Sequence, residues 1–232
     1  MMVVPLLSPR YEEFASDLSE VALQRILDCN GKLAALMINF IQSPDDTMEH
    51  PSKFEYRNGT GVKLHIAGSC CSPDGYIFCP SEDDPSKKKF IIKTWELKRP
   101  YISNYVENFP NVPNSKKFFL QVIIHCLATW TANADLLDCV NYYVCGFDFK
   151  SLMEDSGANG KTLFYNFQEM KDVSLVCAMS ASTFCNIQHL HEVKRIDFKR
   201  VAEIILLKGG SFATVPEVGQ GAPHDQDDDD ES

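Results

Sequence analysis

The clearest pattern in the chain is a pair of short apolar segments, Gly75–Cys79 and residues 89–95, on either side of a polar stretch. Both segments are rich in β-branched and aromatic residues, which favours β-strands. Residues 80–87, between them, are polar and include two prolines, which suits a long hairpin connection. The pattern therefore predicts two antiparallel strands, of which the second runs directly into Trp95-Glu96-Leu97-Lys98.

Elsewhere, apolar residues recur at intervals of three and four in residues 11–42 and 116–130, as expected for amphipathic or buried helices. The first of these helices is predicted to break near Asn30-Gly31 and to cover the sheet. Its predicted inward-facing residues are Phe14, Leu18, Val21, Leu33, Leu36, Met37 and Phe40. Strands are predicted at residues 61–67, 141–149, 162–167 and 173–179, a loop at 103–115, and a last helix at 198–208 that Asp197 caps. This mixture predicts an α/β (α+β) fold with a mixed central β-sheet flanked by helices.

Two acids and a lysine stand at the ends of the predicted hairpin strands. Asp74 precedes the first strand, and Glu96 and Lys98 close the second. Because residues i and i+2 of a strand share a face, Glu96 and Lys98 would project together, while Leu97 points to the core and leaves its carbonyl free. Oxygen ligands suit Mg²⁺ or Mn²⁺, and an ammonium group stabilises a charged phosphate. The pattern predicts metal ligands at Asp74, Glu96 and Leu97, with Lys98 as electrostatic catalyst; the alternative is an ordinary turn and an exposed strand face.

The helix predicted at residues 116–130 has one polar exception, Gln121. Packed against the motif strand, its amide could orient the attacking water or a ligand carboxylate, and Lys117 on the same face could meet a phosphate. Alternatively, Gln121 is a core-edge residue bonded to a loop carbonyl. His125 shares this face, and we expect it to be a structural group rather than a base.

Asp74, Glu96 and Lys98, in this order, resemble the metal-binding motif of the PD-(D/E)xK nuclease superfamily. Within it, three segments are most similar to the DXO-type decapping exoribonucleases: Glu96-Leu97-Lys98, Lys117-Phe118-Phe119-Leu120-Gln121 and residues 142–148, which include Gly146-Phe147. A weaker likeness covers Phe54 to Gly59 and includes Arg57. The resemblance implies a hydrolase that uses Mg²⁺ or Mn²⁺ to remove incomplete or non-canonical caps, and degrade RNA, at 5′ ends in messenger RNA quality control.

The chain also departs from that family. The family's upstream glutamate has no clear counterpart, and Asp74 lacks the companion acid of a Glu-x-Asp motif. With fewer carboxylates, the chain could be a slow nuclease or an inactive member that binds RNA ends or a protein. A second resemblance is to the phage lambda exonuclease and YqaJ type of DNA nuclease. It covers Asp74-Gly75, Glu96-Leu97-Lys98-Arg99-Pro100 and the Gln121 helix. We rank it after the resemblance to the DXO-type enzymes.

The composition limits where a nucleic acid could bind. The net charge is −10, of which six acids in the tail contribute −6, leaving −4 for the rest. Nucleic acid would therefore need a local basic groove. The predicted nucleic-acid-binding residues are Arg57, Lys93, Arg99, Lys116 and Lys117, and Tyr101, Tyr105 or Phe109 could stack bases. The acidic tail is predicted to be a disordered solubilising segment, or an intramolecular phosphate mimic that competes for the groove.

With 232 residues and 44% hydrophobic content, the chain is expected to form one nuclease-like domain, residues 1–215, followed by the tail, residues 216–232. The start of the chain lacks the pattern of a signal peptide or membrane span, which predicts an intracellular protein of nucleus or cytoplasm. The nine cysteines then read as reduced thiols. The alternative is a zinc site, with ligands from Cys70, Cys71, Cys79, His189 and His191.

Overall fold

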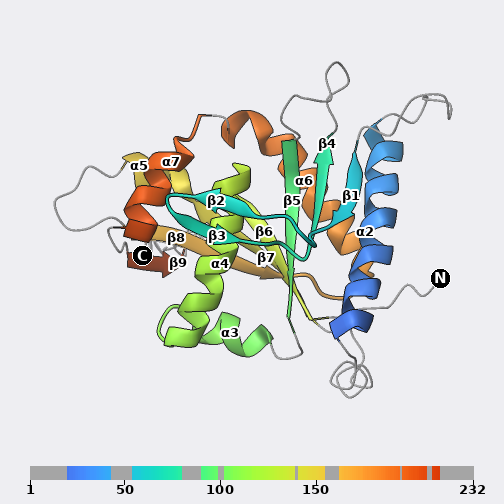
Figure 1. Ribbon diagram of the computed structural model, residues 1–232, viewed down its shortest axis with the longest axis horizontal. Coiled ribbons are helices and arrows are strands. Elements are labelled where there is room, and N and C mark those ends of the chain that lie inside the picture. The colour runs from blue at the N-terminus through green and yellow to red at the C-terminus, as the bar shows by residue number, and fades with distance from the viewer. Residues whose placement is uncertain are drawn as a thin grey trace, which may run out of the picture.

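Figure 1 shows a computed structural model of the chain, built around a seven-stranded sheet with the order β1-β4-β5-β6-β7-β8-β9. The structure describes residues 20–42, 54–79, 90–98, 102–138, 141–154, 162–193, 195–207 and 211–214. The strands are β1 (Glu55–Asn58), β2 (Leu64–Ile66), β3 (Ser69–Cys71), β4 (Gly75–Cys79), β5 (Phe90–Leu97), β6 (Asn133–Leu137), β7 (Tyr142–Asp148), β8 (Thr162–Glu169) and β9 (Ser211–Thr214). The helices are α2 (Glu20–Gln42), α3 (Ile102–Asn108), α4 (Pro113–Thr129), α5 (Phe149–Glu154), α6 (Leu175–Val193), α7 (Phe198–Ala202) and the π-helical turn η1 (Glu203–Leu207).

The sheet is mixed, as the sequence predicts. β5–β6 and β8–β9 are parallel pairs, and the other neighbouring strands of the sheet are antiparallel. β4 and β5 form the predicted antiparallel pair, with Gly75 opposite Trp95. The parallel β5–β6 pair requires a crossover, and helices α3 and α4 supply it.

Helices cover both faces of the sheet. α2 and α6 pack together on one face, and α4, with the separate β2–β3 hairpin beside it, lies on the other (Figure 1). Alternate residues of a strand therefore enter different cores. In β6, Ala134 and Leu136 join the core around α4, whereas Leu137 joins the core around α2 and α6. No helix among the described residues is both long and apolar enough to cross a membrane.

The predicted break in the first helix is wrong, because α2 continues through Asn30 and Gly31. A Cβ atom at position 31 would lie 2.3 Å from the Tyr56 ring, so glycine there lets the helix approach β1 closely. The predicted inward face is also wrong: Val21, Leu36 and Phe40 are 62%, 61% and 71% exposed, and Met37 is 38% exposed. The buried face consists instead of Leu23, Leu27, Ala34, Ala35 and Ile38. Leu33 is half-buried, and Phe14 and Leu18 lie outside the described residues.

Three other predicted elements are corrected. Residues 103–115 are mainly helical rather than a loop, because they hold most of α3 and the start of α4, whose first residue is Pro113. Residues 173–179 enter α6 rather than a strand, since an apolar run of this length fits either structure. Residues 61–67 contribute only the short strand β2. The last helix is capped as predicted, with the Asp197 carboxylate accepting from Arg200 N at 3.1 Å, although a π-helical turn follows it.

A polar network lies in the core between β5, β6 and α6. Lys93 and Asp135 are fully buried, and their Nζ and Oδ1 atoms are 2.6 Å apart. Asp135 also accepts hydrogen bonds from Tyr142 and from Ser182, and Lys93 donates to Asn133. Burial of two charges is costly, so each depends on its partners. The prediction that Lys93 binds nucleic acid is wrong, because its ammonium group is enclosed in the core.

Removing the Lys93 charge alone should therefore destabilise the fold. We expect Lys93→Met to lower the free energy of unfolding by about 3–5 kcal/mol, because it leaves the Asp135 carboxylate buried without its counter-charge. Adding Asp135→Asn should recover part of this loss, since the amide oxygen can still accept from Tyr142 and Ser182. Urea unfolding measures both effects. Lys171→Ala, which removes a surface ion pair with Glu169, is the control and should cost less than about 1 kcal/mol.

Candidate active site

The backbone and side chain of Asp74 are held at the junction of β4 and β5. Its amide donates to the Trp95 carbonyl at 3.0 Å, and its own carbonyl accepts from Gly59 N at 3.0 Å and from Gln24 Nε2 at 2.9 Å. Its carboxylate oxygen Oδ2 accepts from the amide of Leu97 at 2.6 Å. Asp74 is therefore fixed directly beside the end of the strand that carries Glu96.

A carboxylate on α2, Asp28, contacts β1, the strand that pairs with β4 beside this junction. Asp28 accepts from Tyr56 Oη and from Gln24 Nε2, both at 2.9 Å, and from Asn58 Nδ2 at 3.2 Å. Burial, then the nearby Asp28 carboxylate, and more weakly Asp74, raise the pKa of Tyr56 well above its ordinary value. Sequence reasoning missed Asp28 and Gln24. Their spacing of four residues, on a helix predicted to cover the sheet, was the available signal.

Glu96 lies at the centre of the site and is almost fully buried. Its Oε1 atom forms an ion pair with the Lys98 ammonium, whereas Oε2 has no hydrogen-bond partner among the residues that the structure describes. Burial raises the pKa of Glu96 to about 7, although the Lys98 charge opposes this shift; the Asp74 charge adds to it. Glu96 thus contacts Lys98 directly, and the Asp74 carboxylate lies near enough for its charge to act on Glu96.

His125 of α4 faces Glu96 on the face of the sheet that α4 covers. Its Nε2 atom lies 3.6 Å from Glu96 Oε2, and the Ser72 backbone is a further polar neighbour besides Glu96 and Lys98. Burial, followed by the Lys98 charge, lowers the pKa of His125 to about 3, while the nearby Ser72 backbone acts in the opposite direction. The ring is therefore neutral at pH 7.

Gln121 belongs to the same face of α4. On this helix, Phe118, Gln121 and His125 follow one another at intervals of three and four, which places them in one row. The Lys98 ammonium lies 5.2 Å from the Phe118 ring centroid, and His125 faces Glu96. Gln121, half-buried, therefore stands on the side of α4 that faces the site, as the sequence predicts.

The other predicted nucleic-acid contacts are spread over the surface. Lys116 and Lys117 are exposed on the first turns of α4. Arg57 is exposed on β1, where it pairs with Glu55 at 3.4 Å and lies 4.7 Å from the Phe78 ring centroid. Arg99 and the tail, residues 216–232, lie outside the described residues. Of these cations, Lys116 and Lys117 share α4 with the row that faces the site.

Within the described part of the chain, no three histidine, cysteine, aspartate or glutamate side chains form a group that could hold a metal ion. This finding also gives no support to a zinc site. Asp74 and Glu96 can together offer two carboxylates. Mg²⁺ suits such a site, because it commonly binds through one or two carboxylates and completes its shell with water and substrate phosphates.

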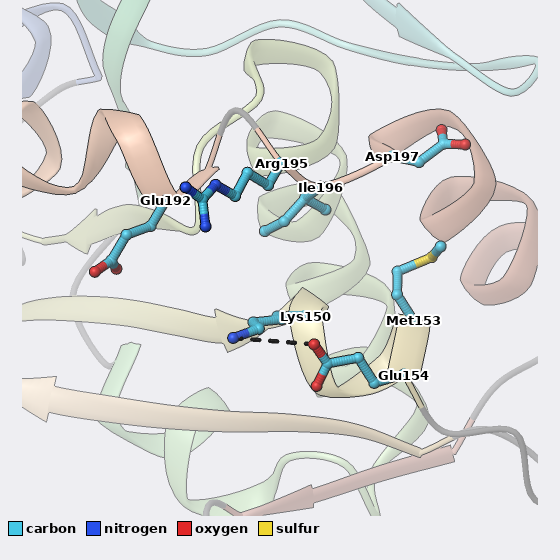
Figure 2. Close-up of a pocket in the computed structure, with 7 residues that line it drawn as sticks. All are labelled: Lys150, Met153, Glu154, Glu192, Arg195, Ile196 and Asp197. Atoms are coloured by element: carbon cyan, nitrogen blue, oxygen red, sulfur yellow. Dashed lines mark ion pairs between the residues drawn. The ribbon is translucent and has the colours of Figure 1, made fainter.

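A cavity of about 640 Å³ lies elsewhere, between α5, the end of α6 and the start of α7 (Figure 2). Figure 2 shows charged side chains around it, including the ion pair of Lys150 and Glu154, whose Nζ and Oε1 atoms are 3.9 Å apart. Both side chains are largely exposed, so water already solvates their charges. The buried, incompletely paired Glu96 is a stronger indication of chemistry than this open cavity.

No family model, curated protein or solved structure matches the chain.

The raised pKa of Glu96 predicts a pH-dependent contribution to stability. Between its ordinary pKa of 4.5 and the folded-state pKa of about 7, the folded protein holds a proton that the unfolded chain has released. Raising the pH through this range therefore destabilises the folded state. Relative to wild type, Glu96→Gln should gain on the order of 3 kcal/mol between pH 4 and pH 8.

Urea unfolding of both proteins in EDTA, at several pH values across this range, measures the difference. A difference that is the same at pH 4 and pH 8 would contradict the raised pKa.

Proposed function

We propose that this chain is a divalent-metal-dependent nuclease that hydrolyses phosphate bonds at RNA 5′ ends, of the decapping and 5′-3′ exoribonuclease type. The observation that carries the proposal is the meeting of Asp74, Glu96 and Lys98 at the β4–β5 junction. Glu96 presents a buried oxygen without a hydrogen-bond donor. A buried acceptor of this kind is costly unless something else binds it, and a cation is a suitable partner.

The two carboxylates would hold one Mg²⁺ or Mn²⁺ ion, with the Leu97 carbonyl as a further oxygen ligand. When bound, the ion neutralises charge on the scissile phosphate and lowers the pKa of a bound water. The backbone contacts of Asp74 fix one carboxylate in advance, so that little conformational freedom is lost on binding.

Lys98 has the freedom to act on a phosphate. Its side chain is 31% exposed, whereas the Glu96 carboxylate that it contacts is enclosed. The ammonium can therefore reach a phosphate at the surface while its other donors remain near Glu96. Gln121, on the facing row of α4, would orient the attacking water through its amide. His125 stays neutral and adds no charge that would repel the ion.

The choice of RNA 5′ ends rests on the resemblance of three motifs to the DXO-type enzymes. Two of the counterparts lie on elements in contact, Glu96 and Lys98 at the end of β5 and Gln121 on α4, whereas Gly146-Phe147 lies on β7, which β6 separates from β5. On this proposal the protein acts inside the cell, in nucleus or cytoplasm, on messenger RNA with defective caps. The lambda exonuclease and YqaJ resemblance gives the competing substrate, duplex DNA.

A second function is favoured by the small number of acids. Because the described residues hold no group of three potential metal ligands, a two-metal site is not assembled from them. A chain with this fold could therefore use the same site for binding an RNA end or a protein and catalyse nothing. Metal uptake separates the two functions.

Calorimetry with Mn²⁺ and a cleavage assay test the nuclease proposal. We expect wild type to bind Mn²⁺ and to shorten 5′-phosphorylated or incompletely capped RNA, and Asp74→Asn and Glu96→Gln to lower the cleavage rate at least about 100-fold. Glu55→Gln is the matched control: it also removes one carboxylate, but from an exposed pair with Arg57, and should leave uptake and rate unchanged.

Three results would redirect the proposal. Mn²⁺ uptake that does not change in Asp74→Asn and Glu96→Gln would favour the binding module. Cleavage of duplex DNA alone would favour the lambda and YqaJ type of substrate. Equal loss of cleavage in Glu55→Gln would show that the effect is not specific to the site.

A further inference from the structure

An aromatic pair lies next to the Lys98 ammonium. The Phe118 ring, whose centroid is 5.2 Å from Lys98 Nζ, stacks on the Tyr105 ring with a centroid distance of 4.9 Å and an interplanar angle of 28°. Phe118 is nearly buried, whereas Tyr105 is 36% exposed. The accessible part of this pair is therefore a tyrosine ring that touches the same phenylalanine as the candidate catalytic lysine.

Both ends of the helix that carries Tyr105 are anchored. At the start of α3, the amide of Ile102 donates to Asp138 Oδ2 at 3.1 Å, and the Ile102 side chain is fully buried. Just after α3, Phe109 is buried among the rings of Phe119 and Tyr165, which corrects the expectation that Phe109 could stack a base. With both ends fixed, Tyr105 is held in place rather than free to collapse onto the surface.

Positive charge lies beside this ring pair. Lys117 is the residue before Phe118, and Lys116 lies 5.5 Å from the Phe212 ring centroid of β9; both are exposed. Of these three cations, Lys98 lies over the Phe118 ring itself, and Lys116 extends toward β9. Glu107, on the same short helix as Tyr105, is the exposed acid of α3. An exposed ring together with cations is the combination that binds single-stranded nucleic acid.

We propose that Tyr105 is a stacking platform for one unpaired base of a single-stranded nucleic acid whose phosphate lies at Lys98. This inference rests on the proposed nuclease function and specifies its substrate as a single strand. The bases of a duplex are already stacked on each other, so only an unpaired base can use the free part of the Tyr105 ring. Lys117, the exposed residue before Phe118, would meet a neighbouring phosphate of the same strand.

Binding assays in EDTA, which prevent metal-dependent cleavage, test the platform. The probes are a fluorescein-labelled 5′-phosphorylated RNA 10-mer and the same sequence as a duplex. We expect wild type to prefer the single strand, Tyr105→Ala to weaken its binding about tenfold or more, and Tyr105→Phe, the matched control that keeps the ring, to bind within about twofold of wild type.

A second measurement begins with an arm on wild type alone, which does not depend on how well Tyr105→Ala folds. Wild type is given RNA with a single abasic position at each of the first four nucleotides in turn. Affinity should fall at one position, and Tyr105→Ala should not distinguish that position. Equal binding by Tyr105→Ala and Tyr105→Phe, equal loss at every abasic position, preference for the duplex, or no measurable binding of the single strand would each overturn the platform.

Failure of the platform and failure of the nuclease proposal give different results. Loss of single-strand affinity in Tyr105→Ala, in a protein that cleaves nothing, would retain the platform and reject the nuclease. Cleavage that depends on Glu96, together with unchanged affinity in Tyr105→Ala, would retain the nuclease proposal and reject the platform.

Discussion

The buried ion pair between Lys93 and Asp135 determines how β5 lies in the sheet. β5 and β6 are parallel neighbours in the sheet, with Trp95 opposite Asp135. The ion pair of Lys93 and Asp135 therefore links these two strands through their side chains. A shift of one residue would turn every β5 side chain to the opposite face and leave both charges buried without partners. With Lys93 and Trp95 facing α6, alternation directs Glu96 toward α4 and His125. The position of the candidate catalytic acid thus follows from a salt bridge that takes no part in the chemistry.

The two buried acids of the sheet differ in how completely they are paired. Asp135 receives hydrogen bonds from Lys93, Tyr142 and Ser182, which compensate its removal from water. Glu96 has one lysine partner on one oxygen, none on the other, and a neutral histidine nearby. A fold that satisfies one carboxylate fully could satisfy the other in the same way, for example by a donor at position 125 that reaches Glu96. The incomplete pairing of Glu96 is therefore a local property of the site, of the kind that metal ligands and catalytic acids show before their partner binds.

The sequence predicts those strands and helices whose pattern of apolar and polar residues is visible within the segment itself. Alternation marks β4, β5, β7 and β8, and three-to-four spacing marks α4, so Asp74, Glu96, Lys98 and Gln121 could be placed together in advance. What it does not predict depends on partners far away in the chain. Residues 175–179 form a helix because α6 packs on α2 and β5, and β6 was missed because its buried Asp135 looks like a surface residue until Lys93 is known to face it. For the same reason, the sequence predicts a surface position for Lys93. It also gives no indication that Asp28 and Asp74 both accept from Gln24.

Electrostatics limits how this protein can hold a nucleic acid. With a net charge of −10, the chain as a whole repels a polyanion, so long-range attraction cannot supply the affinity. If the proposals hold, affinity must come from contacts at short range, with one phosphate at Lys98 and one base on the Tyr105 ring. Contacts of this kind suit a strand end better than the middle of a duplex, because an end has bases that are free to stack and few phosphates that are repelled. The acidic composition, which argues against a general nucleic-acid-binding protein, is therefore compatible with an enzyme that acts on ends.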